Sequence, residues 1–301
     1  MTDPIVLRAA TRGSPLARWQ ADHVAALLAA AHPGVQVEIV VVDTEGDRRL
    51  DVPISAFGGK GVFAKEVQAA VLDGRADFAV HSAKDLPSVT VDGLALACVP
   101  ERGNPRDALV GATLDELAPG AEVATGSQRR RAQLAAHRPD LVFTELRGNM
   151  ATRLSKVPTG GAIVVAAVAL ERLGLADQIA ETLTVDQLIP QVGQGALAVE
   201  CRADDQRTRQ LLGAIEHRPS RRRVDAERAF LAELGGDCDL PAGAHAVHRG
   251  VQDDDGLLLH AFLATEGSAN ARTVSHRAAG DDPGSLGTSV ARHLRQALGP
   301  T

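Results

Sequence analysis

The chain has 301 residues, of which 45% are hydrophobic, and a formal net charge of −6 at pH 7. This length predicts two or three domains, with enough apolar side chains for packed cores. The acidic balance disfavours a nucleic-acid-binding protein, and the number and spacing of Cys98, Cys201 and Cys238 argue against a disulfide framework or a cysteine metal site.

The first hundred residues alternate predicted strands and helices. A strand begins at Ile5, and a helix with Ser14 as its N-cap runs from Pro15 to about His32. The further predicted elements are a strand over 35–42, a helix ending at Leu72, a strand over 77–82 and a turn over 83–87. Such alternation favours an α/β domain whose sites lie at the carboxyl ends of the strands.

A second unit of the same design is expected to begin near Arg102. Ser127 is predicted to cap a helix over 128–137. A strand that ends in a turn is expected over 123–127, and further strands are expected over 143–146, 162–167 and 196–200. From about Pro219 the pattern changes to a helix, a turn around Cys238, strands over 244–248 and 257–263, a loop over 281–284 and a final helix.

Two turns of small residues precede predicted helices and have arginine beside them. They are Thr11–Ser14, which includes Arg12, and Thr125–Ser127, which is followed by Arg129 and Arg130. Free backbone N–H groups and the helix dipole make such a turn suited to an anion. One such turn is explained by helix capping alone, whereas two in successive α/β units suggest a cleft that binds anions between domains.

Other residues with useful chemistry follow predicted strands. Asp85 could serve as a general acid and base, or as a turn aspartate that bonds its own backbone. Arg147 and Arg153, together with Arg12, could bind a polycarboxylate because a guanidinium donates two parallel hydrogen bonds. Each of these arginines taken singly could equally be a surface residue. His81 lies on a predicted strand and is expected to be a core histidine.

Cys238 lies in a segment that excludes a continuous helix or central strand, because two glycines precede it and Pro241 follows. The thiol is therefore expected on a tight turn. Asp237 and Asp239 flank it, and we expect these carboxylates to raise the pKa of the thiol. This argues against an activated nucleophile and leaves a tether, a structural thiol, a slow nucleophile or a cysteine without a task.

Seven motifs occur in order over nearly the whole chain: TRGSPLA, GGKGVFAKE, HSAKDLP, ATGSQRRRAQL, LRGNMATRLSK, VGQGALAVECR and the Cys238 turn. Together they closely resemble the porphobilinogen deaminase (hydroxymethylbilane synthase) family of tetrapyrrole biosynthesis, although the resemblance weakens after Gly250. It implies an α/β fold with two domains built like periplasmic binding proteins around a cleft, and a smaller C-terminal α/β domain with an antiparallel sheet. Mapped onto this chain, the domains are residues 1–100 with 196–217, residues 101–195 and residues 218–301.

The resemblance also implies a transferase reaction and a cofactor. Members of the family condense four porphobilinogen molecules stepwise onto a dipyrromethane primer, release ammonia at each coupling and hydrolyse the product to hydroxymethylbilane. The primer is linked as a thioether to the cysteine that matches Cys238. Asp85 matches the catalytic aspartate, which would protonate the departing amine and stabilise positive charge on the pyrroles.

The remaining site residues follow from the same resemblance. The arginines that match those holding acetate and propionate side chains are Arg12, Arg129, Arg130, Arg147, Arg153 and Arg172. The other expected cofactor or substrate contacts are Ser14, Ser82, Lys84, Thr125, Ser127, Gln194 and Lys60, the last in a mobile loop over the cleft. No metal ligand is implied. The chain departs from the family at Gly126, where a serine is common, which removes a possible hydroxyl contact.

A non-catalytic anion-binding protein of the periplasmic type is the alternative. It would share the two-domain cleft, but the third, cysteine-bearing domain counts against it. The start of the chain has no basic segment followed by an apolar one, and the apolar runs are short, so neither a signal peptide nor a membrane span is expected. We therefore expect a cytoplasmic monomer that acts on porphobilinogen and binds neither nucleic acid nor membrane.

Overall fold

The computed structural model describes residues 5–44, 64–235, 240–250, 255–265 and 271–299. Lys60 and Cys238 therefore lie outside the described residues. The contacts group the chain into two units, Met1–Arg102 with Ala196–Arg221 and Gly103–Gly195 with Arg222–Thr301. The chain passes from one unit to the other three times.

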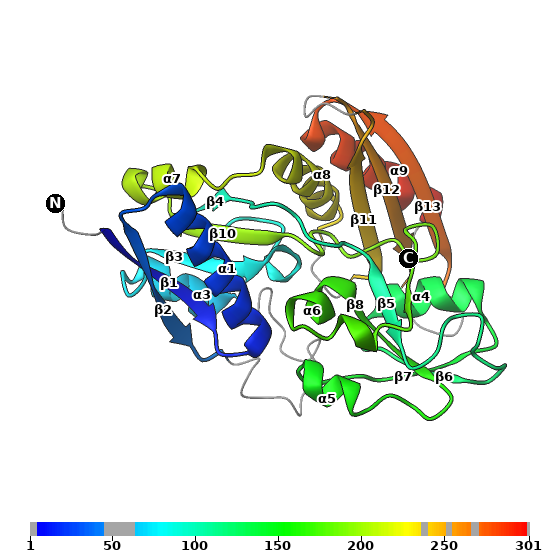
Figure 1. The fold of residues 1–301 in the computed structure, drawn as a ribbon. Helices are drawn as coiled ribbons and strands as arrows, with labels where there is room; N and C mark the ends of the chain where they lie inside the picture. The colour runs from blue at the N-terminus through cyan, green and yellow to red at the C-terminus, as the bar shows by residue number, and fades with distance from the viewer. Residues whose placement is uncertain (1–4, 45–63, 236–239, 251–254, 266–270, 300–301) are drawn as a thin grey trace. The chain divides into compact units, whose positions relative to one another are not determined.

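The first unit is built on a five-stranded sheet with strand order β2-β1-β3-β10-β4 (Figure 1). The strands are β1 (Ile5–Arg12), β2 (Val35–Val42), β3 (Phe78–Ser82), β4 (Leu94–Cys98) and β10 (Leu197–Arg202). β1 runs parallel to β2 and β3, whereas β10 runs antiparallel to β3 and β4. The chain thus returns late in the sequence to supply an inner strand of its first sheet.

Helices cover both faces of this sheet. On one face, α1 (Pro15–Ala31) and α7 (Gln206–Gly213) contribute Val24, Leu28 and Leu212 to a core with strand residues such as Leu7 and Phe78. On the other face, α3 (Lys65–Leu72) packs Val67, Ala70 and Val71 against the sheet. A sheet with both faces buried needs apolar residues on successive positions, as in β3, where Phe78 to His81 are all buried.

The second unit contains a five-stranded sheet of the same design, with strand order β7-β6-β8-β5-β9. Its strands are β5 (Asp107–Val110), β6 (Glu122–Ala124), β7 (Val142–Thr144), β8 (Ala162–Ala166) and β9 (Glu181–Thr182). β6, β7 and β8 are parallel, and β5 runs antiparallel to both β8 and β9. Its helices are α4 (Gln128–His137), α5 (Met150–Leu154) and α6 (Ala167–Arg172), followed by a 3-10 helix over Ala176–Gln178.

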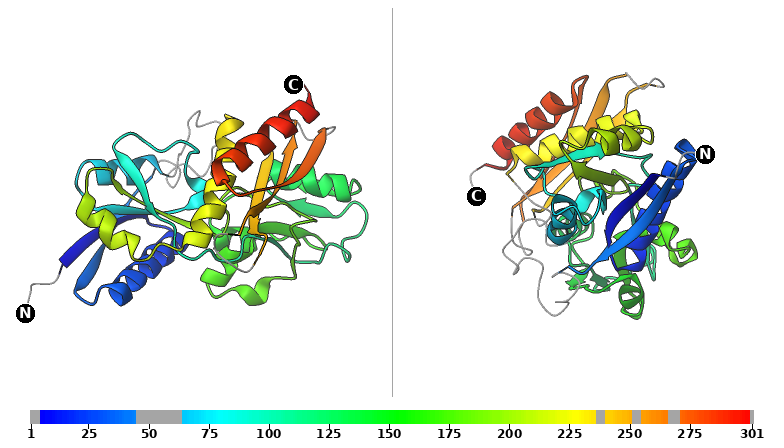
Figure 2. Two further views of the ribbon diagram at one scale, coloured as in Figure 1. Left: turned by 90° about the horizontal axis from the view of Figure 1, so that it is seen from above. Right: turned by 90° about the vertical axis from the view of Figure 1, so that its left-hand side faces the viewer.

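The second unit also contains an antiparallel sheet formed by β11 (Ala242–His248), β12 (Leu257–Ala264) and β13 (Thr273–Gly280). α8 (Arg218–Glu233) and α9 (Pro283–Leu298) pack on one face of it, and α9 is the red helix that lies along this sheet in both views of Figure 2. The core between them includes Phe230, Leu259 and Leu294. The expected fold class is confirmed: two similar α/β domains and a smaller C-terminal domain with an antiparallel sheet.

Most predicted elements agree with the structure, and one prediction is wrong. The loop expected over 281–284 is the start of α9, because the Asp282 carboxylate accepts a hydrogen bond from Ser285 N at 2.8 Å and Pro283 occupies the first helical turn. Aspartate followed by proline is a helix-start signal as well as a loop signal. β4, β5, β9 and β13 were not predicted. β13 alternates exposed and half-buried residues and contains little of the β-branched or aromatic content that marks a strand.

Gly287 marks the closest approach of α9 to α8. A Cβ atom there would lie 2.2 Å from the carbonyl oxygen of Ala226 and 2.7 Å from Phe230 N. Because both contacts are backbone, Gly287→Ala should force the helices apart and lower the free energy of unfolding by about 1–3 kcal/mol. Urea unfolding measures this. The control is Gly284→Ala in the exposed first turn of α9, where the nearest atom is 3.6 Å away and stability should be unchanged or slightly raised. Equal stability of both variants would contradict the close contact.

Candidate active site

In the first unit, the expected site residues lie at the carboxyl ends of two neighbouring strands. Arg12 ends β1 and Ser82 ends β3, and these strands are parallel neighbours. Ser14 caps α1, where its Oγ accepts a hydrogen bond from Ala17 N at 3.3 Å. Gln20, one turn further along α1, donates from Nε2 to Ser82 Oγ at 2.8 Å. The structure therefore gathers Arg12, Ser14 and Ser82 at one edge of the sheet.

Asp85 lies at the same edge, in a 3-10 helix over Ala83–Asp85 that directly follows β3 and includes Lys84. The backbone of this turn is fixed, since Ala83 N donates to Ala196 O at 3.0 Å and Leu86 N to Ala83 O at 3.4 Å. The Asp85 side chain is half-buried. Among the described residues, no hydrogen bond or ion pair engages its carboxylate. A held backbone with an unengaged carboxylate is suited to act on a ligand.

A buried polar cluster stands behind this edge. His81 is buried, as expected for a core histidine, and its Nε2 lies 3.3 Å from Glu200 Oε2. Gln68 of α3 donates from Nε2 to the same oxygen at 2.8 Å. Glu200 is 2% exposed and lies on β10. These contacts connect α3, β3 and β10 beneath the Asp85 turn.

In the second unit, the expected residues again follow the parallel strands. Thr125 and Ser127 come after β6, Arg147 comes after β7, and Arg172 ends the helix that follows β8. Ser127 caps α4, and Thr125 Oγ1 accepts a hydrogen bond from Ser127 N at 3.2 Å. These residues share the carboxyl edge of the parallel strands because neighbouring parallel strands end on the same side of a sheet.

The arginines at this edge differ in how they are held. Arg147 is half-buried, and none of the described side chains pairs with its guanidinium. Arg153 donates from Nε to Gly148 O at 2.8 Å. Arg172 donates from Nη2 to Gly195 O at 2.8 Å, and burial lowers its pKa to about 10 against the opposing charge of Glu171. Arg147 is therefore the arginine here best placed to receive a carboxylate.

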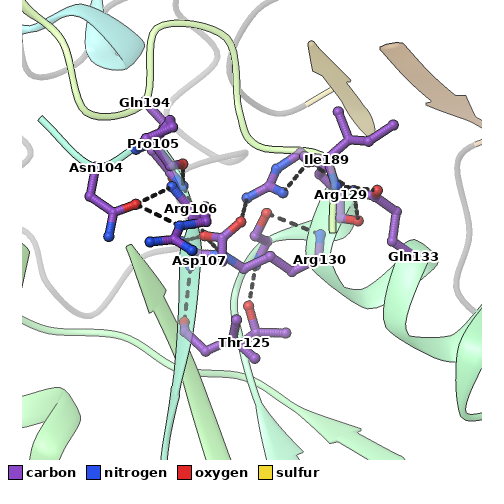
Figure 3. Close-up of polar contacts among 12 residues, drawn as sticks. Asn104, Pro105, Arg106, Asp107, Thr125, Arg129, Arg130, Gln133, Ile189 and Gln194 are labelled. Carbon is purple, nitrogen blue, oxygen red and sulfur yellow. Dashed lines mark hydrogen bonds and ion pairs between the residues drawn. The ribbon is translucent and has the colours of Figure 1, made fainter. Parts of the chain in front are cut away.

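Arg129 and Arg130 are held inside the domain by the carboxylate of Asp107 (Figure 3). Arg129 Nη2 lies 2.8 Å from Asp107 Oδ2, and Arg130 Nε and Nη2 lie 3.0 and 2.7 Å from Oδ1. Gln194 adds a hydrogen bond from Nε2 to the same Oδ1 at 3.1 Å. All four residues are buried, and the single Asp107 carboxylate is shared by two guanidiniums, so the cluster keeps a formal charge of +1.

The electrostatics of Asp107 follow from these contacts. Burial by itself raises the pKa of its carboxyl group, but the charges and hydrogen bonds of Arg129 and Arg130, with Gln194, outweigh burial and lower the pKa to about 2. Burial lowers the pKa of Arg129, and the nearby Asp107 charge opposes this. Asp107 was not among the candidate residues identified from the sequence. Its only signal is a carboxylate at the first position of a fully buried strand.

Gly126 lies where the polypeptide is crowded. A Cβ atom there would be 3.0 Å from Leu146 O and 3.3 Å from Glu145 Oε2. Glu145 also pairs with Arg131 Nη2 at 3.1 Å. A side chain at this position would therefore require small shifts of its neighbours, which gives a local reason for glycine in this chain.

Two kinds of site are not seen among the described residues. Within them, no group of three or more histidine, cysteine, aspartate or glutamate side chains is placed to hold a metal ion. None of the described helices has the length and apolar character needed to cross a membrane.

Two family models match this chain. Residues 7–210 match porphobilinogen deaminase, dipyromethane cofactor binding domain, and residues 221–296 match porphobilinogen deaminase, C-terminal domain. The chain belongs to the porphobilinogen deaminase family. Membership confirms the family identified from the seven motifs and supports a transferase of porphyrin biosynthesis with porphobilinogen as substrate and a dipyrromethane cofactor. In the second unit, the guanidinium of Arg147 has no partner among the described residues, which suits the carboxylate groups of such a cofactor.

Solved structures give weaker likenesses. The methionine binding protein MetQ is 13% identical over 70% of this chain and 89% of its own, with a TM-score of 0.45. YhfZ from Shigella flexneri is 16% identical over 78% and 93% of the two chains, with a TM-score of 0.38. The reduced OxyR regulatory domain from Pseudomonas aeruginosa is 14% identical over 70% and 97%, with a TM-score of 0.40. These scores are too low to support an argument about this deaminase-family chain.

Replacing Asp107 tests the cluster. Asp107→Asn should leave two buried guanidiniums without a counter-charge and lower the free energy of unfolding at pH 7 by about 3–5 kcal/mol. Because the folded pKa of about 2 is below the ordinary value of about 4, the contribution of Asp107 is complete above pH 4 and is lost as the pH falls toward 2. The difference between wild type and variant should shrink over that range in urea titrations.

The matched control is Glu145→Gln, which breaks the partly exposed pair with Arg131 and should cost far less stability. Equal free energies of unfolding for Asp107→Asn and Glu145→Gln at pH 7 would show that the buried cluster contributes no more stability than the partly exposed pair.

Proposed function

We propose that this chain is a hydroxymethylbilane synthase that couples four porphobilinogen molecules head to tail, with loss of one ammonia at each coupling, and releases hydroxymethylbilane by hydrolysis. The observation that carries the proposal is the match of residues 7–210 to the dipyromethane cofactor binding domain of the family. A covalent dipyrromethane primer, when bound, supplies the free pyrrole carbon onto which the first substrate is added. We further propose that the protein acts as a cytoplasmic monomer, without nucleic acid or membrane.

Asp85 is proposed as the general acid and base. Its carboxyl group would give a proton to the departing amine, and its carboxylate would then stabilise the positive charge left on the substrate pyrrole. The structure supports this role through the position of Asp85 at the carboxyl end of β3, its partial burial and its lack of a protein partner among the described residues. The fixed backbone of its turn restricts the positions that the carboxylate can adopt.

Arginines at the two sheet edges are proposed to bind the acetate and propionate groups of the pyrroles. Arg147 has the strongest support, because the residue is half-buried and no described group pairs with its guanidinium. Arg12 and Arg153 lie on the same edges. Ser14, Ser82, Lys84, Thr125, Ser127 and Lys60 remain proposed contacts of the cofactor or substrate. Arg129, Arg130, Arg172 and Gln194 remain in the proposed set, although their described contacts are to protein groups.

Cys238 is proposed as the attachment point of the primer, through a thioether. The two other thiols are poor candidates, since both are buried in the core of the first sheet. Burial raises the pKa of Cys201 to about 11 and raises that of Cys98 as well. A thiol held protonated and away from solvent is a weak nucleophile.

The intact mass of the purified protein tests the proposal. We expect an excess over the polypeptide equal to two porphobilinogens minus two ammonias. Cys238→Ser should lose this excess, whereas Cys201→Ser, at a buried thiol, should keep it. A protein of bare mass that also fails to gain the excess after incubation with porphobilinogen would contradict the proposal and favour an anion-binding protein.

Asp85→Asn should abolish most turnover while leaving the fold intact. We expect ammonia release from porphobilinogen to fall roughly 10²–10⁴-fold, because the amide can neither donate the proton nor stabilise the cation. The control is Asp92→Asn, at an exposed aspartate of the same unit, which should release ammonia at the normal rate. Near-normal release by the Asp85 variant would exclude Asp85 as the acid and base.

A further inference from the structure

Residues 189–195, here called the joint, lie between the α/β part of the second unit and its antiparallel sheet. The joint has no regular secondary structure except turns, yet most of its residues are buried. Polar side chains from both sides hold its backbone. A backbone without a helix or sheet of its own must find such partners when it is buried.

On the α/β side, two side chains of α4 form hydrogen bonds with the backbone N–H and C=O groups of Ile189. Ile189 N donates to Gln133 Oε1 at 2.8 Å, and Ile189 O accepts from Arg129 Nη1 at 2.6 Å and from Gln133 Nε2 at 3.1 Å. Figure 3 shows the side chains of Arg129 and Gln133, both on α4, pointing toward Ile189. At the other end of the joint, Gln194 donates to Pro105 O at 2.7 Å and to Asp107.

On the side of the antiparallel sheet, the joint lies along the edge of β11 that does not pair with β12. Ala244 N donates to Pro190 O at 3.0 Å. The Glu227 carboxylate, which is 0% exposed, accepts from Gly193 N at 2.8 Å and from Ala246 N at 2.9 Å. Val192 packs into the core of the C-terminal domain. The joint and Glu227 therefore satisfy edge N–H groups that β12, on the other side of β11, cannot reach.

At Gly243, the backbone of β11 lies close to the backbone of the joint. A Cβ atom on it would lie 2.8 Å from both Ile189 O and Pro190 O, and 3.1 Å from Arg129 Cδ. Two of these atoms belong to the backbone, so a larger residue must displace β11 or the joint. Gly243 is the second residue of β11, five positions after Cys238 in the sequence.

We propose that Arg129, Gln133, Gly243 and Glu227 are positioning residues, which fix β11, the strand that follows Cys238 in the sequence, on the arginine-bearing α/β domain. This differs from the role of Arg129 as a carboxylate ligand. Its side chain is 3% exposed, and its two terminal nitrogens are bonded to Ile189 O and Asp107 Oδ2. The catalytic consequence rests on the proposed function, whereas the joint itself does not.

Gly243→Ala separates the two roles of Arg129, because it disturbs the joint while every arginine is kept. Hydrogen exchange by mass spectrometry would follow the segment 240–247, which contains the Ala244 and Ala246 amides. Steady-state assays would give kcat and KM for porphobilinogen. Arg129→Met is compared with Arg131→Met, which removes an arginine from the same helix; among the described residues, the side chain of Arg131 pairs with the exposed Glu145.

If the residues act by position, Gly243→Ala and Arg129→Met should both speed exchange of segment 240–247 and lower kcat roughly tenfold or more, with KM within about twofold of wild type. Arg131→Met should match wild type in all three. The proposal is overturned if Gly243→Ala leaves exchange and kcat unchanged, or if Arg129→Met raises KM many-fold while Gly243→Ala does not. If the wild type consumes no porphobilinogen, the proposed function fails. The exchange data alone then decide whether Gly243 and Arg129 fix β11.

Discussion

The second unit depends on one carboxylate buried between two guanidiniums. Asp107 opens β5 and bonds Arg129 and Arg130 of α4, so the ion pairs fix α4 across the carboxyl end of the sheet. Gln194 brings the joint to the same carboxylate. An isolated buried charge of either sign would be very unfavourable, so the three charged groups stabilise the fold only as a set. The cluster thus connects α4, the first residue of β5 and the joint.

The two α/β sheets use the same polypeptide pattern and end with different electrostatics at corresponding edges. In the first unit, the aspartate after β3 has a fixed backbone, and none of the residues that the structure describes bonds its carboxylate. In the second unit, the aspartate opening β5 is engaged by two arginines and a glutamine. Within the described residues, the first carboxylate has no protein partner, whereas the second is part of a buried ion-pair cluster. Identical residue types thus serve opposite purposes because their neighbours differ.

The arginines show the same division. Arg147, at the strand edge, has a guanidinium that no described side chain pairs with, whereas the guanidiniums of Arg129 and Arg130 are bonded to buried protein groups. A polycarboxylate needs cations that are near the surface, oriented and not already neutralised. Within the described residues of this edge, burial and pairing rather than the number of arginines decide which of them meet that need.

The sequence by itself determined the strand and helix alternation, the caps at Ser14 and Ser127, and the family, because these are local patterns and long motifs. It also placed Asp85 and Arg147 directly after strands. It missed β5 and β13, and it could not distinguish Arg147 from Arg129. β5 becomes a strand only by pairing with β8 and β9, and the Asp107 contacts join residues more than 20 positions apart. Burial and charge pairing across such distances arise only when the chain packs, so the tertiary structure alone decided which charges are free and which are bound.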